Sequence, residues 1–72
     1  MPRLPSLSSK EIIKALIKIG YREIRQRGSH IRLSCLHKKS VTVPDHKILG
    51  RGLLRKILRD AELSIKDFRN LL

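Results

Sequence analysis

His30 is the residue whose type and surroundings are best suited to chemistry. It directly follows a predicted tight turn, Gly28-Ser29, and three arginines lie close by in the chain, Arg25, Arg27 and Arg32. An imidazole titrates close to neutral pH, so it can take a proton from a hydroxyl group and return one. Cationic neighbours can hold a phosphate group in the same place. The pattern is typical of phosphodiester cleavage, and a plain surface histidine is the alternative interpretation.

Two stripes of basic residues recur at intervals of four on predicted helices. Solvated helix faces commonly look like this, so each stripe alone is a weak signal. The second stripe begins where its helix begins, and free backbone amides at a helix N-terminus favour phosphate. The first stripe is Lys10, Lys14 and Lys18, and the second is Arg51, Arg55 and Arg59. Together with the residues around His30, the predicted phosphate-binding residues are Arg25, Arg27, Ser29, Arg32, Lys47, Arg51 and Arg55.

Other kinds of site find little support in the sequence. Cys35, His37 and His46 lack the spacing of a zinc site, and no carboxylate cluster is present to hold magnesium. No nucleotide-binding glycine loop occurs. We therefore expect no metal and no cofactor, and chemistry that is independent of metal ions. With Tyr21 and Phe68 as the only aromatic residues, base stacking is unfavourable, so contacts should go mainly to phosphates.

The charge balance points to a nucleic-acid partner. The chain has 72 residues, with 17 Lys and Arg against six Asp and Glu, which gives a net charge of +11. This length predicts one core, with a lead-in over residues 1–7 and a single domain over 8–72. One cysteine favours a reducing compartment, and no apolar stretch is long enough to cross a membrane. We expect a cytoplasmic protein that does not associate with membranes.

Local patterns predict the elements that must position His30. Ser8 and Glu11 fit a capping box at the start of a helix over 9–19, and Gly20 ends that helix. From residue 21 to 43 the apolar period changes to two, which indicates strands. A two-residue type II′ turn at Gly28-Ser29 would set Arg27 opposite His30 and Arg25 opposite Arg32, and would place Ile24 opposite Leu33 on the buried face.

The third strand and two further helices complete the predicted fold. An odd-length connection with its tip at 37–39 lets Val41 and Val43 join the buried face, in a strand over 40–44. An apolar periodicity predicts a helix over 51–62, and Ser64 caps a short final helix. The expected fold class is α+β, a two-layer domain with a three-stranded antiparallel sheet and helices on one face. His30 should point from the open face.

Several ordered motifs resemble the HicA family of mRNA interferase toxins, over about residues 8–70. They are Gly20-Tyr21, Gly28-Ser29-His30, Val43-Pro44-Asp45-His46, Gly52-Leu53-Leu54-Arg55-Lys56-Ile57-Leu58 and Ala61-Glu62-Leu63-Ser64. The resemblance implies that the fold is like that of double-stranded-RNA-binding domains. It implies that the protein is the toxin of a type II toxin–antitoxin pair. It also implies that His30 is the catalytic residue of a ribonuclease acting on mRNA, and that the partner is a HicB-like antitoxin.

Two other functions fit the same charge and fold. A double-stranded-RNA-binding module without catalysis would use His30 only to contact a phosphate or a 2′-hydroxyl. A DNA-binding helix-turn-helix over residues 51–70 fits least, because its second helix is short and apolar and would read a groove poorly. We therefore expect no DNA binding by the toxin alone.

Overall fold

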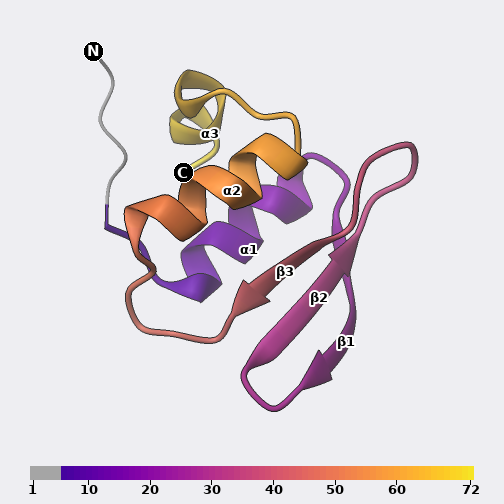
Figure 1. Ribbon diagram of the computed structural model, residues 1–72. Coiled ribbons are helices and arrows are strands. Elements are labelled where there is room, and N and C mark those ends of the chain that lie inside the picture. Colours follow the sequence, from indigo (N-terminus) through magenta and orange to yellow (C-terminus); the bar gives the residue numbers. More distant parts are fainter. Residues whose placement is uncertain (1–5) are drawn as a thin grey trace.

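The computed structural model describes residues 6–72, which form an open three-stranded sheet with the helices along one side (Figure 1). Neighbouring strands are antiparallel and adjacent in the chain, in the order β1-β2-β3. The predicted α+β two-layer fold is confirmed. In chain order the elements are α1 (Ser9–Lys18), β1 (Arg22–Arg27), β2 (His30–Ser34), β3 (Val41–Pro44), α2 (Arg51–Asp60) and α3 (Ile65–Leu71).

The helices bury one face of the sheet. Ile31 and Leu33 on β2 lie opposite Val43 and Val41 on β3, and all four side chains are buried. We call this side the inner face. Side chains alternate along a strand, so His30 and Arg32 lie on the opposite side, which we call the outer face. The inner face packs against the apolar sides of the helices, chiefly Ile12, Leu16, Leu54, Ile57, Leu58 and Phe68.

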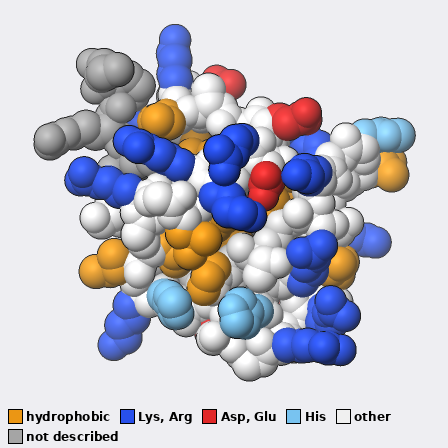
Figure 2. All heavy atoms as spheres, in the orientation of Figure 1, with side chains coloured by type: hydrophobic (Ala, Val, Ile, Leu, Met, Phe, Trp, Pro, Cys, Tyr) orange, Lys and Arg blue, Asp and Glu red, His pale blue; other side chains and the backbone are white. Residues whose placement is uncertain are grey.

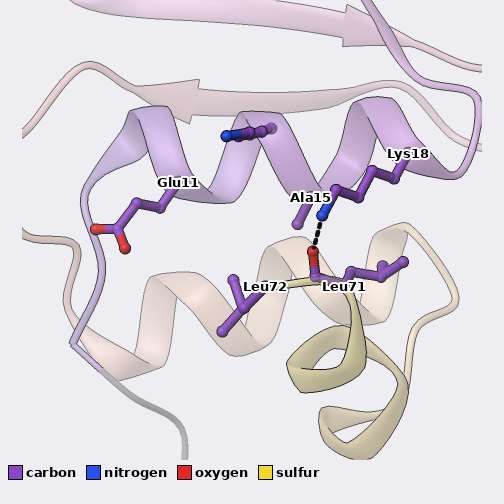
Figure 3. A pocket seen from close by; sticks show the side chains of 6 residues that line it. Glu11, Ala15, Lys18, Leu71 and Leu72 are labelled. Atoms are coloured by element: carbon purple, nitrogen blue, oxygen red, sulfur yellow. Dashed lines mark hydrogen bonds between the residues drawn. The ribbon is translucent and has the colours of Figure 1, made fainter.

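The first helix begins at the predicted residue and ends at Lys18, one residue before its predicted end. The Ser8 hydroxyl accepts a hydrogen bond from the Glu11 amide, and the Glu11 carboxylate accepts one from the Ser8 amide. Gly20 follows with a φ of 105°, a left-handed conformation that glycine adopts without a steric penalty. Figure 3 shows the Lys18 ammonium donating to the Leu71 carbonyl at 2.6 Å, which joins the last turn of α1 to the end of α3.

The N-terminal edge of the predicted domain differs from the sequence expectation at one residue. Leu7, which falls in the predicted lead-in, is buried and forms an isolated bridge with Leu49. The other lead-in residues from 1 to 5 lie outside the described residues. Within residues 6–72, no helix has both the length and the apolar character needed to span a membrane.

The register of β1 differs from the prediction at one residue. The hairpin pairs Arg27 with His30 and Arg25 with Arg32 as expected, and only Gly28 in the turn has a positive φ, which fits type II′. Leu33, however, lies opposite Glu23, because a β-bulge at Ile24 adds an extra residue to the edge strand. The prediction that Ile24 shares the buried face is therefore wrong, since its side chain is 54% exposed.

The bulge lies between two fixed points of the chain. β1 has six residues against the five of β2, and both of its ends are fixed. The Gly28-Ser29 turn fixes one end. At the other end, Tyr21 is buried and its hydroxyl donates to the Lys39 carbonyl at 2.7 Å. Every residue of β1 is exposed, so burial does not hold Ile24 in the ladder, and bulges are common on such edge strands.

The β2–β3 loop is attached to the end of α2. Lys38 donates to the Ala61 carbonyl at 2.8 Å, and Lys39 forms an ion pair with Asp60 at 3.8 Å. Lys56 also donates to Asp60, and this hydrogen bond lowers the pKa of the Asp60 carboxyl. The carboxylates on this side of the molecule are thus engaged by lysines within the fold.

Candidate functional site

His30 lies on the outer face at the end of β2 next to the hairpin turn. It faces Arg27 on one side and Pro44 on the other, because these are its partners on β1 and β3. The imidazole is exposed, and it lines a shallow hollow of about 120 Å³. The other residues lining this hollow are Arg25, Arg27, Arg32 and Thr42. The structure therefore places together the histidine and the three arginines that the sequence singles out.

Two of these arginines form a cross-strand pair of like charges. Arg25 lies directly opposite Arg32, an arrangement that is destabilising by a few tenths of a kcal/mol on its own. Arg32 is held in place, since its Nη1 donates to the Thr42 hydroxyl at 2.9 Å. Within residues 6–72 no carboxylate forms an ion pair with either guanidinium. Both groups are thus available to an anion from outside the protein.

The loop after β3 is hydrogen-bonded to the hairpin turn. The Asp45 amide donates to the Ser29 carbonyl at 2.6 Å, so the turn that carries His30 is attached to the end of β3. The Asp45 carboxylate accepts a hydrogen bond from the Ser9 hydroxyl at 3.1 Å. This contact directs the carboxylate toward α1 and leaves the surroundings of His30 positively charged.

The remaining predicted binding residues lie on other parts of the surface. Lys47 lines a separate hollow with His46 and the first residues of α1. Arg51 and Arg55 are exposed on α2, whose opposite side carries the buried Leu54. No side chain among the described residues caps the N-terminus of α2. The structure therefore groups Arg25, Arg27 and Arg32 with His30 in one hollow, and it does not place Lys47, Arg51 or Arg55 there.

Thr42 and Arg22 are residues of this face that the sequence analysis does not identify. The signal for Thr42 is its place on β3 opposite Arg32, which follows from the buried alternation of Val41 and Val43. Arg22 lies opposite Ser34 and is brought to the outer face by the bulge. No sequence pattern marks that bulge.

The titratable residues considered for metal binding do not come together. Within residues 6–72, no three His, Cys, Asp or Glu side chains form a group that could hold a metal ion. Cys35 is half-buried against the core with its thiol 3.9 Å from the Ile19 carbonyl, while His37 and His46 are exposed on separate loops.

Basic side chains dominate the face of the molecule seen in Figure 2. Blue lysine and arginine side chains cover α2 and the region of the β1–β2 hairpin, and two histidines lie near each other below α2. Few acidic side chains interrupt them, as expected for a chain of net charge +11. Such a surface attracts polyanions and repels other cations.

The fold and the site define a small basic α+β domain that presents one histidine among arginines on the open face of a sheet. A family model described as HicA toxin of bacterial toxin-antitoxin matches residues 9–63. The chain belongs to this family, and it is the toxin of a toxin–antitoxin pair with an antitoxin as its partner. A search of curated proteins gave no match. The matched range runs from the start of α1 to just past α2, so it includes the whole sheet and His30.

Proposed function

We propose that the protein is an endoribonuclease that cleaves mRNA, with His30 as its catalytic residue and a HicB-like antitoxin as its inhibitor. The observation that carries the proposal is the position of the imidazole, exposed in one hollow with three arginines on the face that the helices leave open. Membership of the HicA toxin family supports it independently. Histidine supplies proton transfer, and the arginines supply phosphate binding.

The reaction we propose begins at the ribose 2′-hydroxyl. His30 takes its proton, and the 2′ oxygen attacks the adjacent phosphorus. The bond from phosphorus to the 5′ oxygen breaks, which yields a 2′,3′-cyclic phosphate and a 5′-hydroxyl. The leaving 5′ oxygen takes a proton from a general acid, for which His46 and water are the two candidates. Proton transfer of this kind contributes about 10²- to 10⁴-fold to the rate.

The arginines stabilise the negative charge that develops on the phosphate. Arg27 is the cross-strand partner of His30, and Arg32 is oriented by Thr42. A positioned donor to a developing charge contributes about 10²- to 10³-fold, so the arginine cluster accounts for as much of the acceleration as the imidazole. Guanidinium suits this task because its planar donors match two phosphate oxygens at once.

The antitoxin we expect is acidic and covers the outer face of the sheet. Complementary charge speeds association between proteins and reduces the attraction of the toxin for RNA. Its binding surface would include Arg25, Arg27 and His30, because these are exposed and unpaired in the described part of the chain. Inhibition then follows from direct competition with RNA for the same arginines.

The experiment that tests the proposal is incubation of the purified chain with labelled RNA in EDTA. His30→Ala should lose at least 100-fold in cleavage rate while keeping its affinity for RNA. A matched control is His37→Asn, which removes an exposed imidazole from a position with a φ of 67° that asparagine tolerates. A DNA strand of the same sequence should not be cut, and mass spectrometry should find cyclic phosphate ends.

Three outcomes would contradict the proposal. Full cleavage by His30→Ala would remove His30 from the mechanism. Loss of all cleavage in EDTA would show a metal requirement. Tight RNA binding with no cleavage by the parent would leave the non-catalytic RNA-binding module as the function.

A further inference from the structure

The bulge at Ile24 determines which side chains of β1 lie on the outer face. Counted back from the hairpin by strict alternation, Arg27, Arg25 and Glu23 would share that face with His30. The bulge reverses the order beyond Arg25. Glu23 now lies opposite Leu33 on the inner face, and Arg22 lies opposite Ser34 on the outer face.

A second observation places Glu23 on the inner side independently of the register. The Glu23 side chain lines a groove together with Gln26, Ile31 and residues of α1 such as Ile13. Arg25 and Arg27 line the hollow around His30 on the other side of the sheet. The bulge therefore exchanges an acidic side chain for a basic one on the outer face.

The outer face as a result carries basic side chains along its whole length. Arg22 is exposed at one end and Arg27 with His30 at the other, with Arg25 and Arg32 between them. The two ends are four residues apart along β2, a distance of about 13 Å at 3.3 Å per residue. This length exceeds what a single phosphate needs.

None of the six acidic residues contributes to this face. Two serve at helix starts, Glu11 in its capping box and Asp67 in the first turn of α3. Glu23 lies in the inner groove, and Asp45 bonds to Ser9. The last two, Asp60 and Glu62, form ion pairs with lysines.

We infer that the outer face is a phosphate track along which the RNA backbone extends from His30 toward the far end of β1, with Arg22 as a phosphate contact remote from the point of cleavage. The inference rests on the proposed function, since RNA is its ligand. Arg22 forms no ion pair with the other described residues, so its guanidinium is available. The track offers no Phe, Tyr or Trp ring on which bases could stack, because Tyr21 and Phe68 are both buried in the core and the chain has no Trp.

The test measures binding of a 2′-O-methyl RNA strand, which keeps the phosphates but lacks the nucleophile, over a range of salt concentrations. One phosphate contact to a single strand changes the slope of log K against log salt by about 0.7. Arg22→Gln should therefore reduce that slope by about 0.7 and weaken binding about fivefold at roughly 0.1 M salt. The charge-matched control is Lys66→Gln on α3, which should change the affinity less than about twofold, with no change of slope.

Glu23→Gln distinguishes the two faces of the sheet on which the Glu23 side chain could lie. With Glu23 on the inner face, this variant should bind RNA within about twofold of the parent. An affinity increase as large as the loss in Arg22→Gln would place Glu23 on the track and overturn the inference. Equal effects of Arg22→Gln and Lys66→Gln would overturn it too.

Two further readouts keep this test distinct from that of the proposed function. Cleavage of ordinary RNA by the parent tests the proposed function whatever the Arg22 variant does. If Arg22→Gln weakens binding of the antitoxin while leaving RNA binding unchanged, the Arg22 end of the face serves the protein partner, and the track is rejected. Thermal unfolding checks that each variant remains folded, as expected for exposed positions.

Discussion

An anion between Arg25 and Arg32 should stabilise the fold, and removal of one arginine should abolish most of this effect. The two side chains are direct cross-strand partners, and the Thr42 hydroxyl fixes the orientation of Arg32. Two charge-assisted hydrogen bonds of about 1.5 to 3 kcal/mol each correspond to a dissociation constant on the order of 1 mM for phosphate.

The expected shift follows from linkage between binding and folding. At about 10 mM phosphate, a dissociation constant of about 1 mM adds roughly 1.4 kcal/mol to the free energy of unfolding. A chain of 72 residues has an unfolding entropy near 0.15 kcal/mol/K, so the Tm of the parent should rise by about 9 °C. In Arg25→Ser one bond is lost, the constant rises about tenfold, and the gain falls to about 3 °C.

The assay is thermal unfolding with and without phosphate, with sodium chloride added to keep the ionic strength constant. Lys66→Ser removes the same charge at an exposed position on α3, and its Tm should rise with phosphate as much as that of the parent. In the absence of phosphate, Arg25→Ser should be slightly more stable than the parent, because the like-charge pair is gone. An equal increment in the parent and in Arg25→Ser would refute the anion site.

Two further predictions concern the core that holds the sheet in place. Burial raises the pKa of Tyr21, so the folded protein loses the phenol proton at a higher pH than the unfolded chain does. The buried neutral phenol therefore contributes fully to stability below pH 10, and this contribution is lost as the pH rises above that value. Tyr21→Phe should cost about 1 kcal/mol at pH 7 through the lost bond to the Lys39 carbonyl, and urea titrations should show this difference shrinking at alkaline pH. A constant difference from pH 7 to alkaline pH would contradict the assignment to Tyr21. Phe68→Ala should cost about 3 to 5 kcal/mol in the same titrations, because Phe68 is fully buried, whereas a loss below about 1 kcal/mol would show that α3 is an appendage.

The features predictable from sequence are those determined by neighbours in the chain. The capping box joins Ser8 and Glu11 over three residues, and the turn at Gly28-Ser29 sets the pairing of Arg27 with His30. These local signals predict the order of the elements, the open face and the position of His30 beside arginines on that face. The part of the candidate site closest to the turn was predicted for the same reason, since register is most secure next to the turn that sets it.

The bulge could not be predicted because its cause is not local. It involves Tyr21, whose hydroxyl bonds to the carbonyl of Lys39, 18 residues further along the chain, and a strand whose residues are all exposed. Ile24 is apolar, and alternation alone assigns it to the core. In the structure it lies on an edge strand where burial offers little stabilisation. Arg22 was missed for this reason, as was the position of Glu23.

Four lysines of this domain and three arginines of its outer face differ in their partners. Several lysines donate to carbonyls or carboxylates within the fold, namely Lys18, Lys38, Lys39 and Lys56. Arg22, Arg25 and Arg27 on the outer face make no ion pair with the described residues, although like charges this close destabilise the sheet. A compact ammonium is sufficient for a single carbonyl, whereas a guanidinium can bind two phosphate oxygens together. Arginines without ion pairs on the outer face fit the phosphate-binding role that we propose for it, and local destabilisation of this kind is typical of functional surfaces.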